Sequence, residues 1–305
     1  MAEFSIIDQY FKRASKSGVS LGVGDDSAIV TPPPSQQLVI CTDTLVAGRH
    51  FPLNTSAHAI GWKSVAVNLS DLAAMGAKPH SILLALSLPT VDHGWLAGFS
   101  QGLFDCCDQF GVSLIGGDTT QSSQLTITVT ALGWIEHGQA VTRAGAQVGD
   151  YICVSGQIGD AAFGLQHLGH ALQQRLDYPT PRCNLGQQLK GLASSMIDVS
   201  DGLAQDLGHI LKASNVGAKL QLEQLPINES LKKLEKQQAW HYALAGGDDY
   251  ELCFTISPQN FEKLLRQQLD VPLTIIGEIT QQTGLSFVYM GENHPLPVQG
   301  YQHFA

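Results

Sequence analysis

Basic residues are scarce in this chain of 305 residues, in which 17 Lys and Arg stand against 27 Asp and Glu for a formal net charge of -10. This balance repels polyanions, so we expect no unassisted binding to nucleic acid or to an anionic membrane. No apolar run approaches the ~18 residues that span a bilayer, and the first residues form neither a basic nor a long apolar segment. We therefore expect a cytoplasmic protein with no membrane contact.

Cysteine motifs and nucleotide loops are also missing. The six cysteines include no C-x-x-C pair, which argues against a zinc site or disulfide framework and favours buried, reduced thiols. The nearest approach to a P-loop, residues 61–64 (GWKS), lacks the first glycine and lies in a helical pattern. Protein-kinase signatures and Ser/His/Asp or Cys/His arrangements are absent as well. If ATP binds, metals and a few basic residues must hold its phosphates.

What the chain does contain is aspartate beside glycine, serine or threonine at six places. These are residues 24–26, 42–44, 70–71, 117–118, 198–201 and 247–249. Carboxylates placed on such turns can face a divalent cation, and oxygen is the ligand that Mg²⁺ prefers. Each cluster alone also fits an ordinary turn or a helix cap. Together they predict a Mg²⁺ scaffold for phosphate chemistry, so that a polyanionic substrate would arrive with metal.

Strand and helix patterns alternate along the chain, which predicts an α/β (α+β) architecture with chemistry on the loops. In the first half we expect helices at 3–17, 56–75 and 92–110, and strands at 38–42, 81–88, 112–115 and 125–135. In the second half we expect strands at 151–154, 218–222, 250–256, 273–277 and 285–289, and helices at 159–175, 184–194, 201–213, 228–239 and 258–269. The polar stretch 171–182 reads as a surface loop. A small and polar connector at 143–150 divides the chain into domains 1–145 and 146–305.

Several residues in these patterns are candidates for phosphate chemistry. Asp71 lies in an otherwise small and apolar helix, where a buried carboxylate without a cation would be costly. Asp118 follows a β-run and two glycines, a geometry that suits close approach of an ion. For residues 198–201, metal binding and helix capping are equally good readings. Arg143 can clamp phosphate oxygens at two points, and His50 can contact a substrate phosphate, although a lone His more often has no chemical role.

The order and spacing of these motifs resemble those of a known family. Residues 22–26, 42–51, 67–77, 116–120, 200–203 and 246–252 closely resemble the thiamine-monophosphate kinases, within the superfamily of aminoimidazole-ribonucleotide synthetase and selenophosphate synthetase. The likeness extends to residues 300–304 and so covers essentially the whole chain. It implies a two-domain PurM-like architecture: an N-terminal sheet domain (1–145) that binds ATP and Mg²⁺ and pairs in a homodimer, and a C-terminal α/β domain (146–305).

The resemblance also implies an activity and a set of site residues. The activity is ATP-dependent phosphorylation of thiamine monophosphate to thiamine diphosphate, with ADP as co-product and several Mg²⁺ ions as cofactors. The implied metal ligands are Asp26, Cys41, Thr42, Asp43, Asp71, Asp118, Asp198 and Asp201. The implied ATP contacts are Gly117, Asp118, Arg143 and Ser200, the substrate contacts are His50, Asp248 and Tyr301, and the catalytic residues are Asp71, Asp118 and Arg143.

Two positions depart from the pattern of some relatives. Cys41 replaces a serine, and because a thiol suits Mg²⁺ poorly we expect its backbone carbonyl to be the ligand. Asp248 replaces a glutamate and is one methylene shorter, which weakens the expectation of direct substrate contact.

A mechanism follows from the charge of the reactants. The acceptor is a phosphate monoester that is largely ionised at neutral pH, so it needs no strong general base. The barrier is repulsion between anions, and we expect direct in-line transfer without a phosphoenzyme. The alternatives are another ATP-dependent synthetase of the superfamily, a Mg²⁺-dependent phosphohydrolase and a non-catalytic nucleotide-sensing module.

Overall fold

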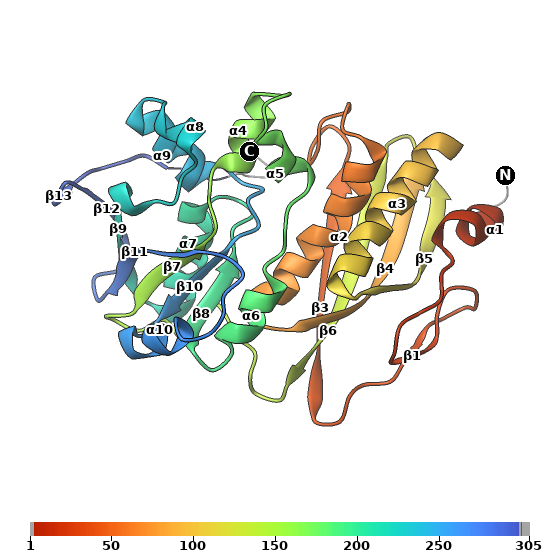
Figure 1. Ribbon diagram of the computed structural model, residues 1–305, viewed down its shortest axis with the longest axis horizontal. Helices are drawn as coiled ribbons and strands as arrows, with labels where there is room; N and C mark the ends of the chain where they lie inside the picture. The colour runs from red at the N-terminus through yellow and green to blue at the C-terminus, as the bar shows by residue number, and fades with distance from the viewer. Residues whose placement is uncertain (1–2, 299, 301–305) are drawn as a thin grey trace. The chain divides into compact units, whose positions relative to one another are not determined.

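The computed structural model describes residues 3–298 and residue 300. The chain divides into two compact units, residues 1–72 with 77–138 and residues 73–76 with 139–305. Each unit contains its own mixed sheet with helices packed against it (Figure 1). The predicted α/β architecture is therefore confirmed.

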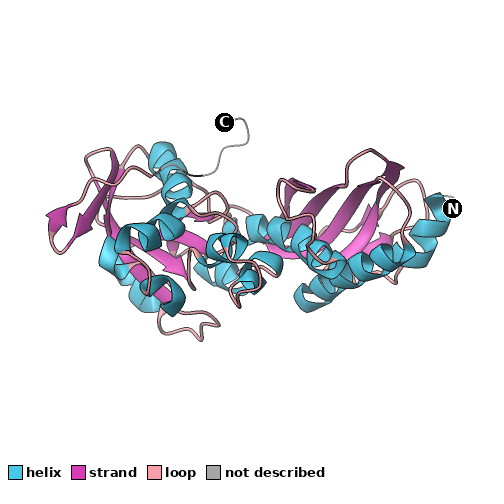
Figure 2. Ribbon diagram, turned by 90° about the horizontal axis from the view of Figure 1, so that it is seen from above, coloured by secondary structure: helices cyan, strands magenta, loops and turns pink. Residues whose placement is uncertain are grey.

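A four-stranded sheet in the order β3-β6-β4-β5 forms the centre of the first unit. Its elements are β3 (Gln36–Val46), α2 (Ala57–Ala74), β4 (Lys78–Leu88), α3 (His93–Phe110), β5 (Ser113–Gln121) and β6 (Thr126–Glu136). The parallel pair β4 and β5 is connected through α3, whereas β3 and β6 are antiparallel to their neighbours. Figure 2 shows the two long helices of this unit on one side of the strands. The sheet thus has one face covered by helices and one open face.

Alternation along β6 shows which side chains occupy each face. Ile127, Val129 and Ala131 are buried against the helices, while Thr128 and Thr130 between them are half-buried on the open face. The covering helix α3 begins where the side chain of Asp92 accepts a hydrogen bond from the N–H of Trp95. It ends at Gly111, whose φ of 71° suits glycine. Local capping and burial therefore explain why this layer forms.

The N-terminal segment differs from the expected helix over 3–17. Helical structure consists of α1 (Glu3–Ile6) and η1 (Ile7–Phe11), and the backbone becomes extended at Lys12. The N–H of Lys16 instead donates to Ser113 Oγ on β5 at 2.9 Å. A short hairpin of β1 (Val19–Leu21) and β2 (Ile29–Val30) follows. The expectation was wrong beyond Phe11 because a tertiary hydrogen bond replaces the helical one.

The second unit is built on a seven-stranded sheet in the order β13-β12-β9-β11-β7-β10-β8. Its strands are β7 (Tyr151–Ser155), β8 (Ala193–Asp198), β9 (Gly217–Gln221), β10 (Leu252–Ile256), β11 (Leu273–Thr280), β12 (Gly284–Tyr289) and β13 (Glu292–Asn293). Its helices are α4 (Asp160–Gln166), α5 (Gln173–Asp177), α6 (Cys183–Leu189), α7 (Leu203–Ser214), η2 (Leu222–Gln224), α8 (Glu229–Lys232), α9 (Lys236–Ala245) and α10 (Pro258–Leu264). Buried apolar residues of α7, α9 and the central strands form one core.

Four expected helices of this unit were wrong in detail. The helix expected over 184–194 ends at Leu189, the helix expected over 258–269 ends at Leu264, and two others are divided. The helix expected over 159–175 is interrupted after Gln166, where Gly169 has a φ of 88°, and resumes as α5 inside the stretch expected to be a loop. The helix expected over 228–239 is likewise divided into α8 and α9. Segment 198–201 was expected at a junction of strand and helix, but no bounds were predicted for the preceding strand β8.

The last features of the fold are its cysteine side chains and the apolar character of its helices. All six cysteines are free thiols, and the prediction of burial is confirmed for five of them, whereas Cys41 is half-buried. Among the described residues, no helix combines the length and the apolar character needed to cross a membrane.

Candidate active site

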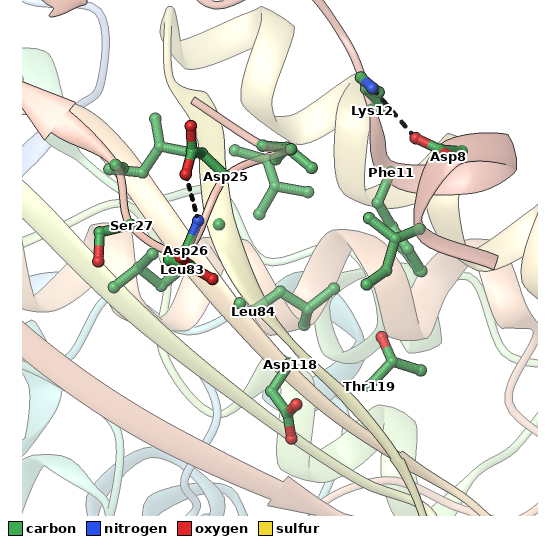
Figure 3. Close-up of a pocket in the computed structure, with 18 of the residues that line it drawn as sticks. Asp8, Phe11, Lys12, Asp25, Asp26, Ser27, Leu83, Leu84, Asp118 and Thr119 are labelled. Atoms are coloured by element: carbon green, nitrogen blue, oxygen red, sulfur yellow. Dashed lines mark hydrogen bonds and ion pairs between the residues drawn. The ribbon is translucent and has the colours of Figure 1, made fainter. Parts of the chain in front are cut away.

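One pocket of about 990 Å³ lies in the first unit, between the N-terminal segment, the loop 23–28 and strands β4 and β5. Two of the predicted metal ligands, Asp26 and Asp118, line it together with the predicted ATP contact Gly117. Figure 3 shows both carboxylates at this pocket along with the apolar side chains of Leu83, Leu84 and Phe11. The pocket thus combines acidic and apolar walls.

Backbone conformation presents the pocket's carboxylates. Gly117 has a φ of 149°, and a Cβ there would lie 1.8 Å from the carbonyl oxygen of Leu84, so only glycine fits. Asp118 follows it within β5, whereas the sequence placed it after the strand. In the loop 23–28, Asp25 Oδ1 accepts the N–H of Asp26 at 2.8 Å. Asp25, Asp26 and Asp118 are all exposed and available to a ligand.

A second group of predicted ligands lies on the helix-covered face of the sheet. The Cys41 thiol donates to the backbone oxygen of Asn68 on α2 at 3.3 Å. Burial raises the pKa of this thiol, and the nearby carboxylates of Asp71 and Asp43 raise it further. The structure therefore brings Cys41, Asp43 and Asp71 together, and without a cation the thiol favours its protonated form.

Strand alternation separates two neighbouring candidates. Thr42 Oγ1 donates to the carbonyl of Val129 at 3.1 Å and lies 3.0 Å from Thr130 Oγ1 on the open face. Asp43 and Cys41 point to the opposite face, because successive side chains alternate along a strand. Asp43 lies inside β3, not after a strand as expected. The side chains of Thr42 and Asp43 therefore do not share one ion.

The predicted substrate contact His50 is held in a tight turn after β3. Its Nδ1 accepts the N–H of Val46 at 3.0 Å, so Nδ1 carries no proton and the neutral ring bears its proton on Nε2. Lys63 on α2 is only 2% exposed, and its Nζ donates to the His50 carbonyl at 3.3 Å. In the sequence, Lys63 was considered only as part of residues 61–64, which do not complete a P-loop pattern. A lysine in an otherwise buried helix was the signal for this contact.

Asp198, Ser200 and Asp201 connect β8 to α7 in the second unit. Asp206 of α7, which is 3% exposed, accepts the N–H groups of Ser200 and Asp201 at 3.0 and 3.1 Å. Burial raises the pKa of Asp206 to about 8, and the neighbouring Asp198 adds to the shift. Helix capping, one of the two readings of this segment, is wrong: neither Ser200 nor Asp201 caps α7. Asp206, the residue that holds this segment, is not among the site residues predicted from the sequence.

Residues 248–251 run beside that segment. Asp248 N donates to the Ser200 carbonyl at 2.9 Å, and Tyr250 N donates to the Val199 carbonyl at 2.8 Å. Asp248 and Tyr250 have φ values of 67° and 51°, a left-handed conformation that is uncommon outside glycine. Asp248 Oδ1 also accepts the Tyr250 hydroxyl at 3.0 Å.

Arg143 and Tyr301 are the remaining residues predicted from the sequence. Arg143 is exposed, and its carbonyl accepts a hydrogen bond from Ser214 Oγ at 3.3 Å. Tyr301 lies outside the described residues.

Across residues 3–298, no three His, Cys, Asp or Glu side chains are gathered closely enough to hold a metal ion alone. The arrangement nevertheless fits Mg²⁺, which proteins usually bind through one or two carboxylates while substrate phosphates and water complete the shell. The pair Asp26 and Asp118 on one pocket offers such a donor set, consisting of oxygen atoms only.

Comparison with known proteins agrees with this organisation. Residues 24–135 match the N-terminal domain of AIR synthase related proteins, and residues 147–290 match the C-terminal domain. The chain is 47% identical to the thiamine-monophosphate kinase of Escherichia coli K12, with 99% of this chain and 98% of the relative covered. It is 34% identical to that of Bacillus subtilis over the full length of both chains.

Solved structures show the same relationship. A thiamine-monophosphate kinase from Stenotrophomonas maltophilia superimposes with a TM-score of 0.84 at 44% identity, covering 95% of this chain and 96% of that one. The structure of AaThiL complexed with AMPPCP and TMP gives a TM-score of 0.79 at 33% identity, with 93% of each chain covered. The hydrogenase maturation protein HypE, at 18% identity, shares the fold. With its two matched domains and these full-length relatives, the chain belongs to the thiamine-monophosphate kinase family.

Proposed function

We propose that this protein transfers the γ-phosphoryl group of ATP to thiamine monophosphate, giving thiamine diphosphate and ADP. The observation that carries the proposal is the pocket on which Asp26, Gly117 and Asp118 meet, whose other walls combine apolar side chains with the Asp8–Lys12 ion pair. Oxygen ligands for a metal-bound polyphosphate stand there beside a surface that suits an aromatic base. The relatives are thiamine-monophosphate kinases along their whole length, and one is complexed with AMPPCP and TMP.

In this proposal the aspartates hold Mg²⁺ and the neighbouring groups hold the substrates. Asp26, Asp43, Asp71, Asp118, Asp198 and Asp201 are the carboxylate ligands, with the Cys41 carbonyl and Thr42 beside them. Mg²⁺ bound to them would neutralise phosphate charge. Gly117, Asp118, Arg143 and Ser200 contact ATP, while His50, Asp248 and Tyr301 contact thiamine monophosphate.

The chain's own groups suit a reaction limited by repulsion between phosphates. His50, with its proton on Nε2, can donate a hydrogen bond to a phosphate oxygen without taking the acceptor's proton. Arg143 supplies permanent positive charge, and its planar guanidinium can bind two oxygens at once. Asp71 and Asp118 would hold Mg²⁺ close to the reacting phosphates, where the ion would offset their negative charge. The acceptor attacks directly, and no residue is phosphorylated on the way.

A homodimer is the second part of the proposal. Leu38 and Ile40 on β3 expose 43% and 58% of their surface, and Ile40 shares the register of the sheet with Leu132 on β6. Large apolar side chains exposed on a regular strand are typical of a surface that pairs with another chain. We propose that this sheet pairs with its counterpart in a second copy, and that the enzyme works in the cytoplasm.

The activity is tested by ³¹P NMR of purified protein with ATP, Mg²⁺ and thiamine monophosphate, omitting each component in turn. We expect equal amounts of thiamine diphosphate and ADP, formed only in the complete mixture. Inorganic phosphate released without the acceptor would instead indicate a phosphohydrolase. Turnover with another phosphorylated acceptor, and none with thiamine monophosphate, would indicate a sister synthetase. A stable phosphoryl-protein adduct that turns over on adding the acceptor would disprove direct transfer.

A further inference from the structure

A network of buried charge in the second unit surrounds Glu251, which is 0% exposed. Its Oε2 accepts hydrogen bonds from Ser155 Oγ and from Arg182 Nε, each at 2.6 Å. Its Oε1 accepts a hydrogen bond from Arg175 Nη2 at 2.7 Å and another from Arg182 Nη2. A buried carboxylate with this many donors is fully compensated, and removing its charge would leave two guanidinium groups without their partner.

The donors come from three separate segments. Ser155 ends β7, Arg175 belongs to α5, and Arg182 precedes α6. Burial alone would lower the pKa of Arg182, but the hydrogen bonds and charge of Glu251 raise it overall. Gly156 leaves room for the carboxylate, because a Cβ there would lie 2.3 Å from Glu251 Oε1. One side chain therefore fastens residue 251 to β7, α5 and the start of α6.

Asp249 anchors the same stretch two residues earlier. It is 1% exposed and accepts the N–H of Gly159 at 2.7 Å and that of Ala161 at 3.4 Å. Tyr250 lies between the two anchors Asp249 and Glu251, and Asp248 precedes them. Both Asp248 and Tyr250 have left-handed backbone conformations. Such conformations are unfavourable for non-glycine residues and persist only where the surroundings enforce them. The inward carboxylates at 249 and 251 provide that enforcement.

The other edge of the stretch faces the proposed metal and ATP ligands. Besides the bonds from Asp248 and Tyr250, Val199 N donates to the Glu251 carbonyl at 2.8 Å. Residues 198–201 are thus hydrogen-bonded to a strained segment whose shape depends on Glu251. A shift of this segment would move Asp198, Ser200 and Asp201 along with Asp248.

We infer that Glu251, with Arg175 and Arg182, is a positioning device for the active site. The inference rests on the proposed function. Glu251 acts through the backbone of 248–251, which sets the positions of the substrate contact Asp248 and of the ligand segment 198–201.

The test is Glu251→Gln in the full-length protein, because it keeps the shape of the side chain and removes its charge. We expect kcat/KM for thiamine monophosphate to fall at least about tenfold, since small misplacements of reacting groups have large effects on rate. We also expect a severalfold weaker affinity for Mg²⁺·AMPPCP, measured by titration calorimetry. The binding measurement tests the positioning of 198–201 even if the protein proves not to phosphorylate thiamine monophosphate, an outcome that the wild-type reaction reports separately.

The matched control is Asp150→Asn. Asp150 is also a buried carboxylate, 5% exposed, and accepts Gln147 N at 2.9 Å and Ser194 Oγ at 2.5 Å. It precedes β7, at the opposite end from Ser155. We expect this variant to lose thermal stability while keeping kcat/KM and nucleotide affinity within about twofold of wild type, because surface and core changes remote from a site act mainly on folding.

Two outcomes would overturn the inference. One is wild-type affinity and kcat/KM in Glu251→Gln. The other is an equal loss in Asp150→Asn at a similar drop in Tm, which would assign the effect to stability alone. If Glu251→Gln does not fold, Arg175→Gln takes its place, because that side chain is 24% exposed and its loss leaves Arg182 on Glu251. Unchanged affinity and kcat/KM in Arg175→Gln would then be the contradicting result.

Discussion

The same tripeptide, Gly-Asp-Asp, occurs once in each unit, at residues 24–26 and 247–249, and the two copies have different surroundings. In the first copy, Asp25 and Asp26 are exposed, and Asp26 lines the pocket. In the second copy, Asp249 is 1% exposed and its carboxylate accepts backbone N–H groups at the start of α4. One copy therefore exposes its carboxylates at a pocket, while the other buries a carboxylate that supports the backbone.

Burial also affects the charge of the carboxyl group in the second copy. Burial raises the pKa of Asp249 well above its ordinary value, and the N–H groups of Gly159 and Ala161 only partly oppose this shift. A carboxyl group in that position favours the neutral form and is a poor Mg²⁺ ligand. Gly-Asp-Asp therefore forms a turn in both units. The packing around the turn decides whether its carboxylates are open to a ligand or support the backbone.

The largest effect is expected from Asp26→Asn. The substitution removes a carboxylate from the pocket without disturbing any packing, so activity should fall roughly 10²–10³-fold, equivalent to about 3–4 kcal/mol of transition-state stabilisation. The melting temperature should stay within about 1 °C of wild type because the side chain is exposed. Steady-state rates measured over a range of Mg²⁺ concentrations check this. Near-normal turnover at limiting Mg²⁺ would remove Asp26 from the ligands.

Asp249→Ala should lower the stability of the fold, which Asp26→Asn leaves almost unchanged. It leaves the N–H groups of Gly159 and Ala161 buried without an acceptor, so the free energy of unfolding should fall by roughly 3 kcal/mol. Urea unfolding followed by circular dichroism measures this loss. Asp249→Asn is the control, because an amide oxygen can still accept the N–H of Gly159, and it should recover most of the stability. Equal losses in both variants would contradict the role of Asp249 as an acceptor.

Much of the fold could be predicted because its signals are local. The helix expected at 92–110 is α3, whose first turn is capped by Asp92 and whose end is marked by Gly111. The limits of β3 and β5 could not be predicted in this way. Both strands continue through Asp43 and Asp118 because neighbouring strands extend the hydrogen-bonded ladder, and pairing between distant segments leaves no local pattern.

The exposed candidate residues of the site could be picked out from the sequence, whereas the residues that support them could not. Asp26, Gly117 and Asp118 carry a visible Gly-Asp pattern, and the structure places all three on one pocket. Glu251 could be noticed only as a charge at the start of an apolar strand. Its partners Arg182 and Arg175 are 69 and 76 residues away in the sequence. Such contacts depend on the tertiary fold, so no local pattern in the sequence reveals them.

A buried carboxyl beside the second Gly-Asp-Asp provides the smallest expected effect. Asp160 is 2% exposed, and its Oδ1 has no hydrogen-bond partner among the described residues. Burial raises its pKa from 3.8 to about 6, while Arg175 opposes the shift and Glu251 adds to it. Asp249 lies close by. The folded protein therefore binds a proton at Asp160 more readily than the unfolded chain does.

The sign of the pH effect follows from this raised pKa. The stability that the protonated carboxyl contributes is complete below pH 4 and is lost as the pH rises through about 6. Asp160→Asn is neutral at every pH, so its stability relative to wild type should improve by roughly 2 kcal/mol between pH 4 and pH 7. Thermal unfolding of both proteins across this range checks the slope, whatever constant offset the amide introduces. A difference in Tm that does not change with pH would show that Asp160 is ionised as easily inside the second unit as an exposed aspartate would be.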